Sequence, residues 1–182
     1  VRKLLEQKPK KDRKRRKNKP YQRADYPGQK VQVDVKHVPT KCVTDGRKYY
    51  QYTAVDECTR WTYRYMYDEH STYSSLDFLH RLVKESPFQI KRIQTDNGSE
   101  WTKWMFTNKP DNPTVFEAGL QFYGIEYQRI GVATPRHNGK VERQHRIDQA
   151  RFYNGLRMFS LLDGQRQLAE YQRKSNRSEE HT

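Results

Sequence analysis

Alternation of apolar and polar residues marks the first part of the chain as β-structure. Residues Val31 to Val38 place valines on one side and polar residues on the other, which is the period of a strand. Two aromatic-rich runs follow at 48–55 and 60–67, and the short turn between them predicts an antiparallel hairpin. Four aromatic residues of the second run fall on one face of the predicted strand: Trp61, Tyr63, Tyr65 and Tyr67.

Helical spacing begins near residue 71 and then alternates with short strands. In the first helix Ser71 or Thr72 is the expected cap, and the buried stripe is Leu76, Leu79, Leu82 and Val83. The segment 101–115 has no clean period and predicts a loop, whereas Ser160 to Asp163 resembles a capping box. The order β-β-β-α-β-α-β-α-α predicts an α/β fold with a mixed sheet and helices on its faces. We expect helices at about 71–85, 116–123, 139–153 and 160–174, and short strands at 90–95 and 125–129.

Positive charge is concentrated at the beginning of the chain. The formal net charge is +14, and residues 1–25 alone carry 12 Lys and Arg against 3 acids. Such a run repels itself and buries nothing, so it predicts an unfolded arm. Contact with nucleic acid phosphates and a solvated linker or localisation signal are equally good interpretations of this arm. We therefore divide the chain into a basic arm (1–27), a core (28–175) and a tail (176–182), and the initial Val suggests that it is a fragment of a longer protein.

The remaining composition narrows the class of protein. One domain with a genuine core is expected from 182 residues, and its 13% aromatic content means that Tyr rings must supply part of that core. No apolar run is long enough to span a membrane. Cys42 and Cys58 match neither a CxxC motif nor a Cys/His zinc pattern, which favours a reducing compartment.

Three carboxylates stand inside a strand, just after a strand and at the start of a helix. Asp34 interrupts a valine-rich strand, Asp96 follows the strand at 90–95, and Glu142 falls in the first turn of a helix. Each has an ordinary explanation: a solvent-facing strand residue, a turn starter, or a partner for the helix dipole. Together they suggest a cage for divalent metal, because two Mg²⁺ ions about 3.5–4 Å apart can drive phosphodiester chemistry.

Residues around these acids have predicted roles as well. Asn97 and Gly98 are expected to shape the turn behind Asp96, with a positive φ at Gly98. On the Glu142 helix, Arg146, Gln149 and Tyr153 follow at helical spacing; an ordinary solvated helix face is the alternative, but we expect a surface that contacts DNA. Neither His137 nor His145 is expected to bind metal, and His145 is as readily explained as a packed residue. The expected DNA-binding residues are Arg136, His137, Asn138, Lys140, Arg143, Arg146 and Gln149.

Three strings of sequence carry a family resemblance. Val33-Asp34-Val35-Lys36, Thr95-Asp96-Asn97-Gly98-Ser99-Glu100 and Pro135 to Arg146 resemble the DDE catalytic core of bacterial insertion-sequence transposases, which is related to retroviral integrases. The similarity covers roughly 28–174 and includes Ala54-Val55-Asp56 before Thr59-Arg60-Trp61. It implies a ribonuclease-H-like fold, with a five-stranded mixed sheet flanked by helices. It also implies that Asp34, Asp96 and Glu142 bind two Mg²⁺ ions, or Mn²⁺ as a substitute.

The resemblance implies a metal-dependent polynucleotidyl transferase that cuts transposon ends and joins them to target DNA. The expected partners are those DNAs and further copies of the chain, without a membrane, in the cytoplasm beside the bacterial nucleoid. A ribonuclease-H-like nuclease without strand transfer and a non-catalytic DNA-binding remnant are the alternatives. Between Asp96 and Glu142 lie 45 residues, more than is usual in this family, and Glu117 and Glu126 compete for the third position. We place the extra length in 101–115, where surface insertions cost little.

Overall fold

Five strands form one mixed sheet in the computed structural model, which describes residues 23–103, 112–130 and 138–179. The strands run in the order β3-β2-β1-β4-β5, with β1 antiparallel to β2 and parallel to β4. Strands β2 and β3 form the antiparallel hairpin, and β5 extends the parallel side. The predicted mixed sheet is confirmed. The strand bounds are β1 Val31–His37, β2 Tyr50–Asp56, β3 Thr62–Tyr67, β4 Arg92–Thr95 and β5 Glu126–Arg129.

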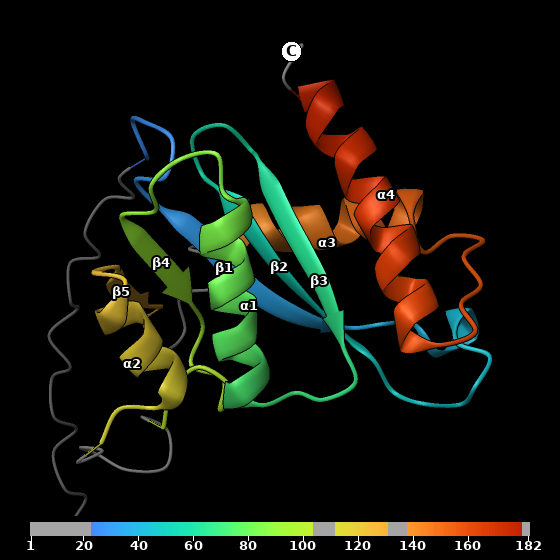
Figure 1. The fold of residues 1–182 in the computed structure, drawn as a ribbon. Coiled ribbons are helices and arrows are strands. Elements are labelled where there is room, and N and C mark those ends of the chain that lie inside the picture. Colours follow the sequence, from blue (N-terminus) through green and yellow to red (C-terminus); the bar gives the residue numbers. More distant parts are fainter. Residues whose placement is uncertain (1–22, 104–111, 131–137, 180–182) are drawn as a thin grey trace, which may run out of the picture.

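Helices cover both faces of this sheet (Figure 1). Helices α1 and α2 pack against each other on one face, while α3 contacts β1 and β2, and α4 contacts β3, from the other. The predicted cap of α1 is present, because the Ser71 side chain accepts a hydrogen bond from the backbone N–H of Ser74. The helix bounds are α1 Thr72–Glu85, α2 Val115–Phe122, α3 Gly139–Arg151 and α4 Leu161–Glu179, and a 3-10 turn, η1, lies at Thr40–Cys42.

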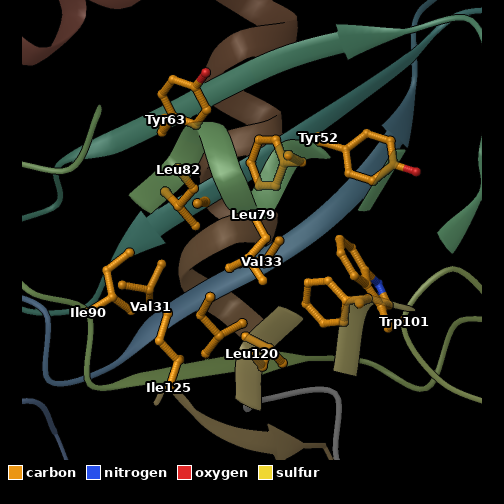
Figure 2. Close-up of a cluster of buried hydrophobic side chains, with 14 residues drawn as sticks. Val31, Val33, Tyr52, Tyr63, Leu79, Leu82, Ile90, Trp101, Leu120 and Ile125 are labelled. Atoms are coloured by element: carbon orange, nitrogen blue, oxygen red, sulfur yellow. The ribbon is translucent and has the colours of Figure 1, made fainter. Parts of the chain in front are cut away.

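The main hydrophobic core lies between the sheet and the α1–α2 layer (Figure 2). Its sheet side includes Val31, Val33 and Tyr63, with the other three aromatic residues of β3 and its preceding turn packed against it. The predicted aromatic face is therefore confirmed. Trp101, fully buried beside Tyr52, anchors the beginning of a segment for which the sequence pattern predicts only a loop.

A second core lies on the opposite face, between the sheet and α3–α4. It consists of Val38, Cys42, Tyr49, Met66, Tyr153, Met158 and Leu168. Beside it the Arg64 guanidinium lies 2.9 Å from the Asp148 carboxylate, and both side chains are fully buried. Gln51 and Gln144 also donate hydrogen bonds to Asp148. This polar cluster joins α3 to the β2–β3 hairpin and fixes the helix that carries Glu142.

Several helix ends differ from the sequence prediction; α3, for example, ends at Arg151 instead of near residue 153. Helix α4 continues to Glu179, five residues past the predicted end, and Asn176 exchanges hydrogen bonds with the backbone of Thr62. Helix α2 begins with a capping box in which the Thr114 side chain and the Glu117 carboxylate each bind the other's backbone N–H. In the described part of the chain, no helix is long and apolar enough to cross a membrane.

Candidate active site

Asp34 lies on the face of β1 that looks toward α3. It shares strand parity with Gln32 and Lys36, both of which contact α3, whereas Val31 and Val33 face the main core. Strand β1 pairs with β4 in the register Gln32 to Gln94. Continued two residues along both parallel strands, this register brings Asp34 level with Asp96, just beyond the end of β4.

Negative charge accumulates around Asp34. Burial and, after it, the negative charges of Asp96, Glu100 and Glu142 together raise the pKa of Asp34 to about 7. Asp34 is therefore near all three acids. Its other neighbour is His145, whose Nδ1 lies 3.5 Å from Asp34 Oδ2. Burial and the nearby Lys36 lower the pKa of His145 to about 4, so the ring is neutral at neutral pH and does not form an ion pair with Asp34.

The turn that carries Asp96 is held at both ends. Asp96 accepts a hydrogen bond of 2.9 Å from the backbone N–H of Gly98, and Asn97 Nδ2 donates to the carbonyl of Ile130 at the end of β5. The prediction of a positive φ at Gly98 is wrong, because the positive-φ glycines are elsewhere. The glycine leaves space instead: a Cβ there would lie 2.4 Å from Glu100 Oε2, so a larger residue would displace the Glu100 carboxylate.

Glu100 is a site residue for which the sequence pattern predicts no role. Its side chain is 7% exposed and pairs with His70 Nε2 at 3.0 Å, while the His70 ring stacks on Tyr50. A buried carboxylate one turn after Asp96 is costly without a partner. The sequence signal that could have identified it is the glutamate at the end of the string Asp96-Asn97-Gly98-Ser99-Glu100. The contact with His70 indicates that Glu100 stabilises the turn that carries Asp96.

Glu142 stands exposed in the first turn of α3, and a strand residue caps that helix. Asn138, the residue before α3, makes no side-chain cap. Gln32 Oε1 on β1 accepts hydrogen bonds from the backbone N–H groups of Lys140 (3.0 Å) and Val141 (3.3 Å) instead. Gln32 Nε2 in turn donates to Glu57. The start of α3, and with it Glu142, is therefore tied to the strand that carries Asp34.

Glu117 and Glu126, the two alternative candidates for the third acid, form other interactions. Glu117 closes the capping box of α2 and also accepts a hydrogen bond from Thr102 Oγ1. Glu126 forms an exposed ion pair with Arg92 at 2.6 Å. Neither appears among the groups that shift the pKa of Asp34, whereas Glu142 does. These contacts favour Glu142.

The predicted DNA-binding residues occupy different environments. Arg143 and Arg146 are exposed and Lys140 is half-buried, where burial and then Arg60 and Arg23 lower its pKa. Gln149 accepts a hydrogen bond from Lys36, and Asn138 is only 5% exposed. Arg136 and His137 lie outside the described residues.

Tyr153 does not belong to the exposed surface. The prediction that it continues the DNA-facing stripe is wrong, because Tyr153 is fully buried and its hydroxyl donates to Gln51. It follows the last residue of α3 by two, where the chain turns back into the second core. Helical spacing was extrapolated past the end of the helix.

The donor set around Asp34 fits a hard divalent cation. Carboxylate oxygens are the ligands that Mg²⁺ prefers, and a cation would offset the repulsion that raises the pKa of Asp34. Within residues 23–103, 112–130 and 138–179, however, no three His, Cys, Asp or Glu side chains already form a closed metal-binding group.

Comparison with known proteins places this arrangement in a family. The model of the integrase core domain matches residues 24–135. A putative integrase, ORF3 of Spiroplasma virus SpV1-C74, is 32% identical over 148 residues, covering 78% of this chain and 41% of that protein. The chain thus spans less than half the length of the curated relatives that it matches.

Solved structures share the fold. The simian T-cell lymphotropic virus intasome, in complex with a PP2A regulatory subunit, aligns with a TM-score of 0.57 at 18% identity, covering 71% of this chain and 41% of the other. The catalytic core domain of HTLV-2 integrase, solved with magnesium, aligns with a TM-score of 0.52 at 20% identity, covering 70% and 72%. The predicted ribonuclease-H-like fold is confirmed. The chain belongs to the integrase core domain family, the DDE cores of integrases and transposases.

Proposed function

We propose that this core is a metal-dependent polynucleotidyl transferase that cuts the ends of a mobile DNA element and joins them to target DNA. Asp34, Asp96 and Glu142 hold two Mg²⁺ ions, for which Mn²⁺ can substitute. Such ions supply an activated attacking oxygen and stabilise the leaving oxygen of an in-line displacement. The protein itself contributes position, since no covalent enzyme intermediate is needed.

One observation carries the proposal: the half-buried Asp34 carboxylate, on the central strand of the sheet and on the face toward α3, lies near three further acids. Carboxylates crowded in this way raise one another's pKa unless a cation is bound. The likeness to the HTLV-2 core, solved with magnesium, agrees with this choice of metal.

Different residues of this chain position each of the three proposed metal ligands. Strand β1 holds Asp34 rigidly, the Gly98 hydrogen bond orients Asp96, and the Gln32 cap presents Glu142. Arg146 follows Glu142 by one helical turn and is exposed, so it is placed to contact a phosphate near the reacting bond. We further propose that two copies or more act together, because two DNA ends must be joined. The HTLV-2 core has been solved in dimeric and trimeric forms.

Strand transfer from a pre-cleaved DNA end tests the proposal. The chain should convert the end and a target duplex into joined products in Mg²⁺, and Glu142→Gln should lose both cleavage and joining. Hydrolysis without joined products would favour the nuclease alternative. DNA binding without either activity, in Mg²⁺ and in Mn²⁺, would favour the non-catalytic remnant.

A further inference from the structure

A cavity of about 310 Å³ lies beside α3, away from the acids. It is lined by Val55, Arg60, Lys140, Arg143, Gln144 and Ile147. The four α3 residues are spaced i, i+3, i+4 and i+7, so they share one face of the helix. Glu142 lies roughly 150° around the helix from the centre of that face, at about 100° per residue. The cavity is thus on the other side of α3 from the candidate metal centre.

Three cations border this cavity without an acidic partner in the part of the chain that the structure describes: Arg60, Lys140 and Arg143. Asp56 and Glu57, which precede Arg60 in the chain, have other partners. Asp56 accepts hydrogen bonds from Gly28 and from both the N–H and the hydroxyl of Thr59. Glu57 pairs with Lys30 at 2.9 Å and accepts from Gln32. Within the described residues no acidic side chain forms an ion pair with these three cations, although the charge of Glu57 acts on Lys140, so the cavity is a cationic hollow.

Arg60 is held in the hollow by an unusual backbone. It is the single non-glycine residue with positive φ (70°) in residues 23–103, 112–130 and 138–179. Only Gly, Asn and Asp adopt this conformation readily. The Asp56 side chain and a hydrogen bond from the Arg60 N–H to the Asp56 carbonyl build the turn that imposes it. The fold thus places a guanidinium at the cavity at a conformational cost.

We propose that this cavity binds a phosphodiester of DNA, at a point away from the bond that reacts. The planar guanidinium of Arg60 can bind phosphate oxygens with two parallel hydrogen bonds, and Lys140 and Arg143 add charge on the opposite wall. The Gln144 amide lines the floor, with its Nε2 donating to Asp148. This inference rests on the proposed function only in taking DNA as the polymer that is bound.

The test is the salt dependence of DNA binding in EDTA, where no metal-dependent chemistry occurs. Arg60→Gly suits the positive φ, removes the guanidinium and should preserve the fold. It should weaken binding of a short duplex about 5- to 20-fold at low salt, and reduce the slope of log K against log salt by about 1, as for one lost phosphate contact. Arg157→Ala, an exposed arginine elsewhere, is the matched control and should change affinity less than about 2-fold. Equal effects of the two variants would overturn the proposal.

A second measurement separates DNA from free anions. In the wild-type chain, the NMR signals of the Arg60 Nε–H and the Gln144 amide should shift when duplex DNA is added. In Arg60→Gly, the Gln144 signal should no longer shift. Inorganic phosphate that shifts these signals while DNA does not would overturn the assignment to DNA. Cleavage by Glu142→Gln is scored separately in Mg²⁺, so a failed metal centre and a failed cavity give different results.

Discussion

The side-chain oxygen of Gln32 accepts a hydrogen bond of 3.0 Å from the backbone N–H of Lys140, across 108 residues of sequence. A strand residue therefore takes the place of the usual cap, which Asn138 does not supply. The same strand carries Asp34 two residues later. This contact fixes the distance between β1 and the beginning of α3, and so relates two of the three proposed metal ligands.

Replacing Gln32 with Met should loosen the beginning of α3. The N–H groups of Lys140 and Val141 would lose their acceptor, and the free energy of unfolding should fall by about 1–3 kcal/mol. Hydrogen exchange at those two amides should quicken more than exchange in the middle of α3. Gln121→Met, at an exposed position of α2, is the control and should leave both quantities nearly unchanged. Unaltered exchange in Gln32→Met would contradict the role of the cap.

The raised pKa of Asp34 makes stability depend on pH. The folded pKa is about 7, above the value of 3.8 expected in the unfolded chain. Between these values the folded state retains a proton that the unfolded state has lost, so metal-free stability falls as pH rises through this window. Asp34→Asn removes the free-energy cost of ionising this carboxylate in the folded state. Relative to wild type, the variant should gain about 2–3 kcal/mol between pH 5 and pH 8 in urea unfolding with EDTA.

The exposed Asp68→Asn is the charge-matched control, and its difference from wild type should be the same at both pH values. Mg²⁺ at pH 8 should stabilise wild type and leave Asp34→Asn largely unaffected. A stability difference between Asp34→Asn and wild type that does not vary with pH would show that the carboxylate is not crowded by its neighbours.

Glu142→Gln should reduce Mg²⁺-dependent cleavage at least about 100-fold, because an amide is a much poorer ligand for Mg²⁺ than a carboxylate. Glu117→Gln should retain most activity, since Gln can also close a capping box. Steady-state cleavage rates at saturating Mg²⁺ compare the two. Should Glu117→Gln be the inactive variant, the third ligand is misassigned.

The buried Arg64–Asp148 pair should matter far more to stability than an exposed pair. Burial alone would raise the pKa of Asp148, but Arg64 and the hydrogen bonds from Gln144 and Gln51 hold it below its usual value. Asp148→Asn leaves the Arg64 charge buried without a counterion and should cost about 3–5 kcal/mol in unfolding free energy. Asp77→Asn breaks the exposed pair with Arg81 and should cost less than about 1 kcal/mol. Equal losses would contradict this account.

Sequence patterns were sufficient for the elements whose contacts are local. The β1 alternation, the aromatic face near β3 and the Ser71 cap depend on residues close in the chain, and all three are confirmed. The box of Thr114 and Glu117 was equally local, and its T-x-x-E signal was present but unused.

The missed features depend on contacts between distant segments. The Gln32 cap joins β1 to α3, and the Glu100–His70 pair joins the Asp96 turn to the segment before α1, so neither leaves a pattern in sequence. Tyr153 keeps helical spacing from Glu142, yet it is buried because α3 has already ended. For Gly98, sequence indicates a glycine requirement but not whether space or a positive φ causes it.

Anomalous diffraction from crystals of the chain bound to DNA and Mn²⁺ is the decisive test of the proposed metal centre. Two peaks are expected, about 3.5–4 Å apart, bounded by the carboxylates of Asp34, Asp96 and Glu142. Peaks elsewhere on the chain, or none among these three side chains at saturating Mn²⁺, would contradict it.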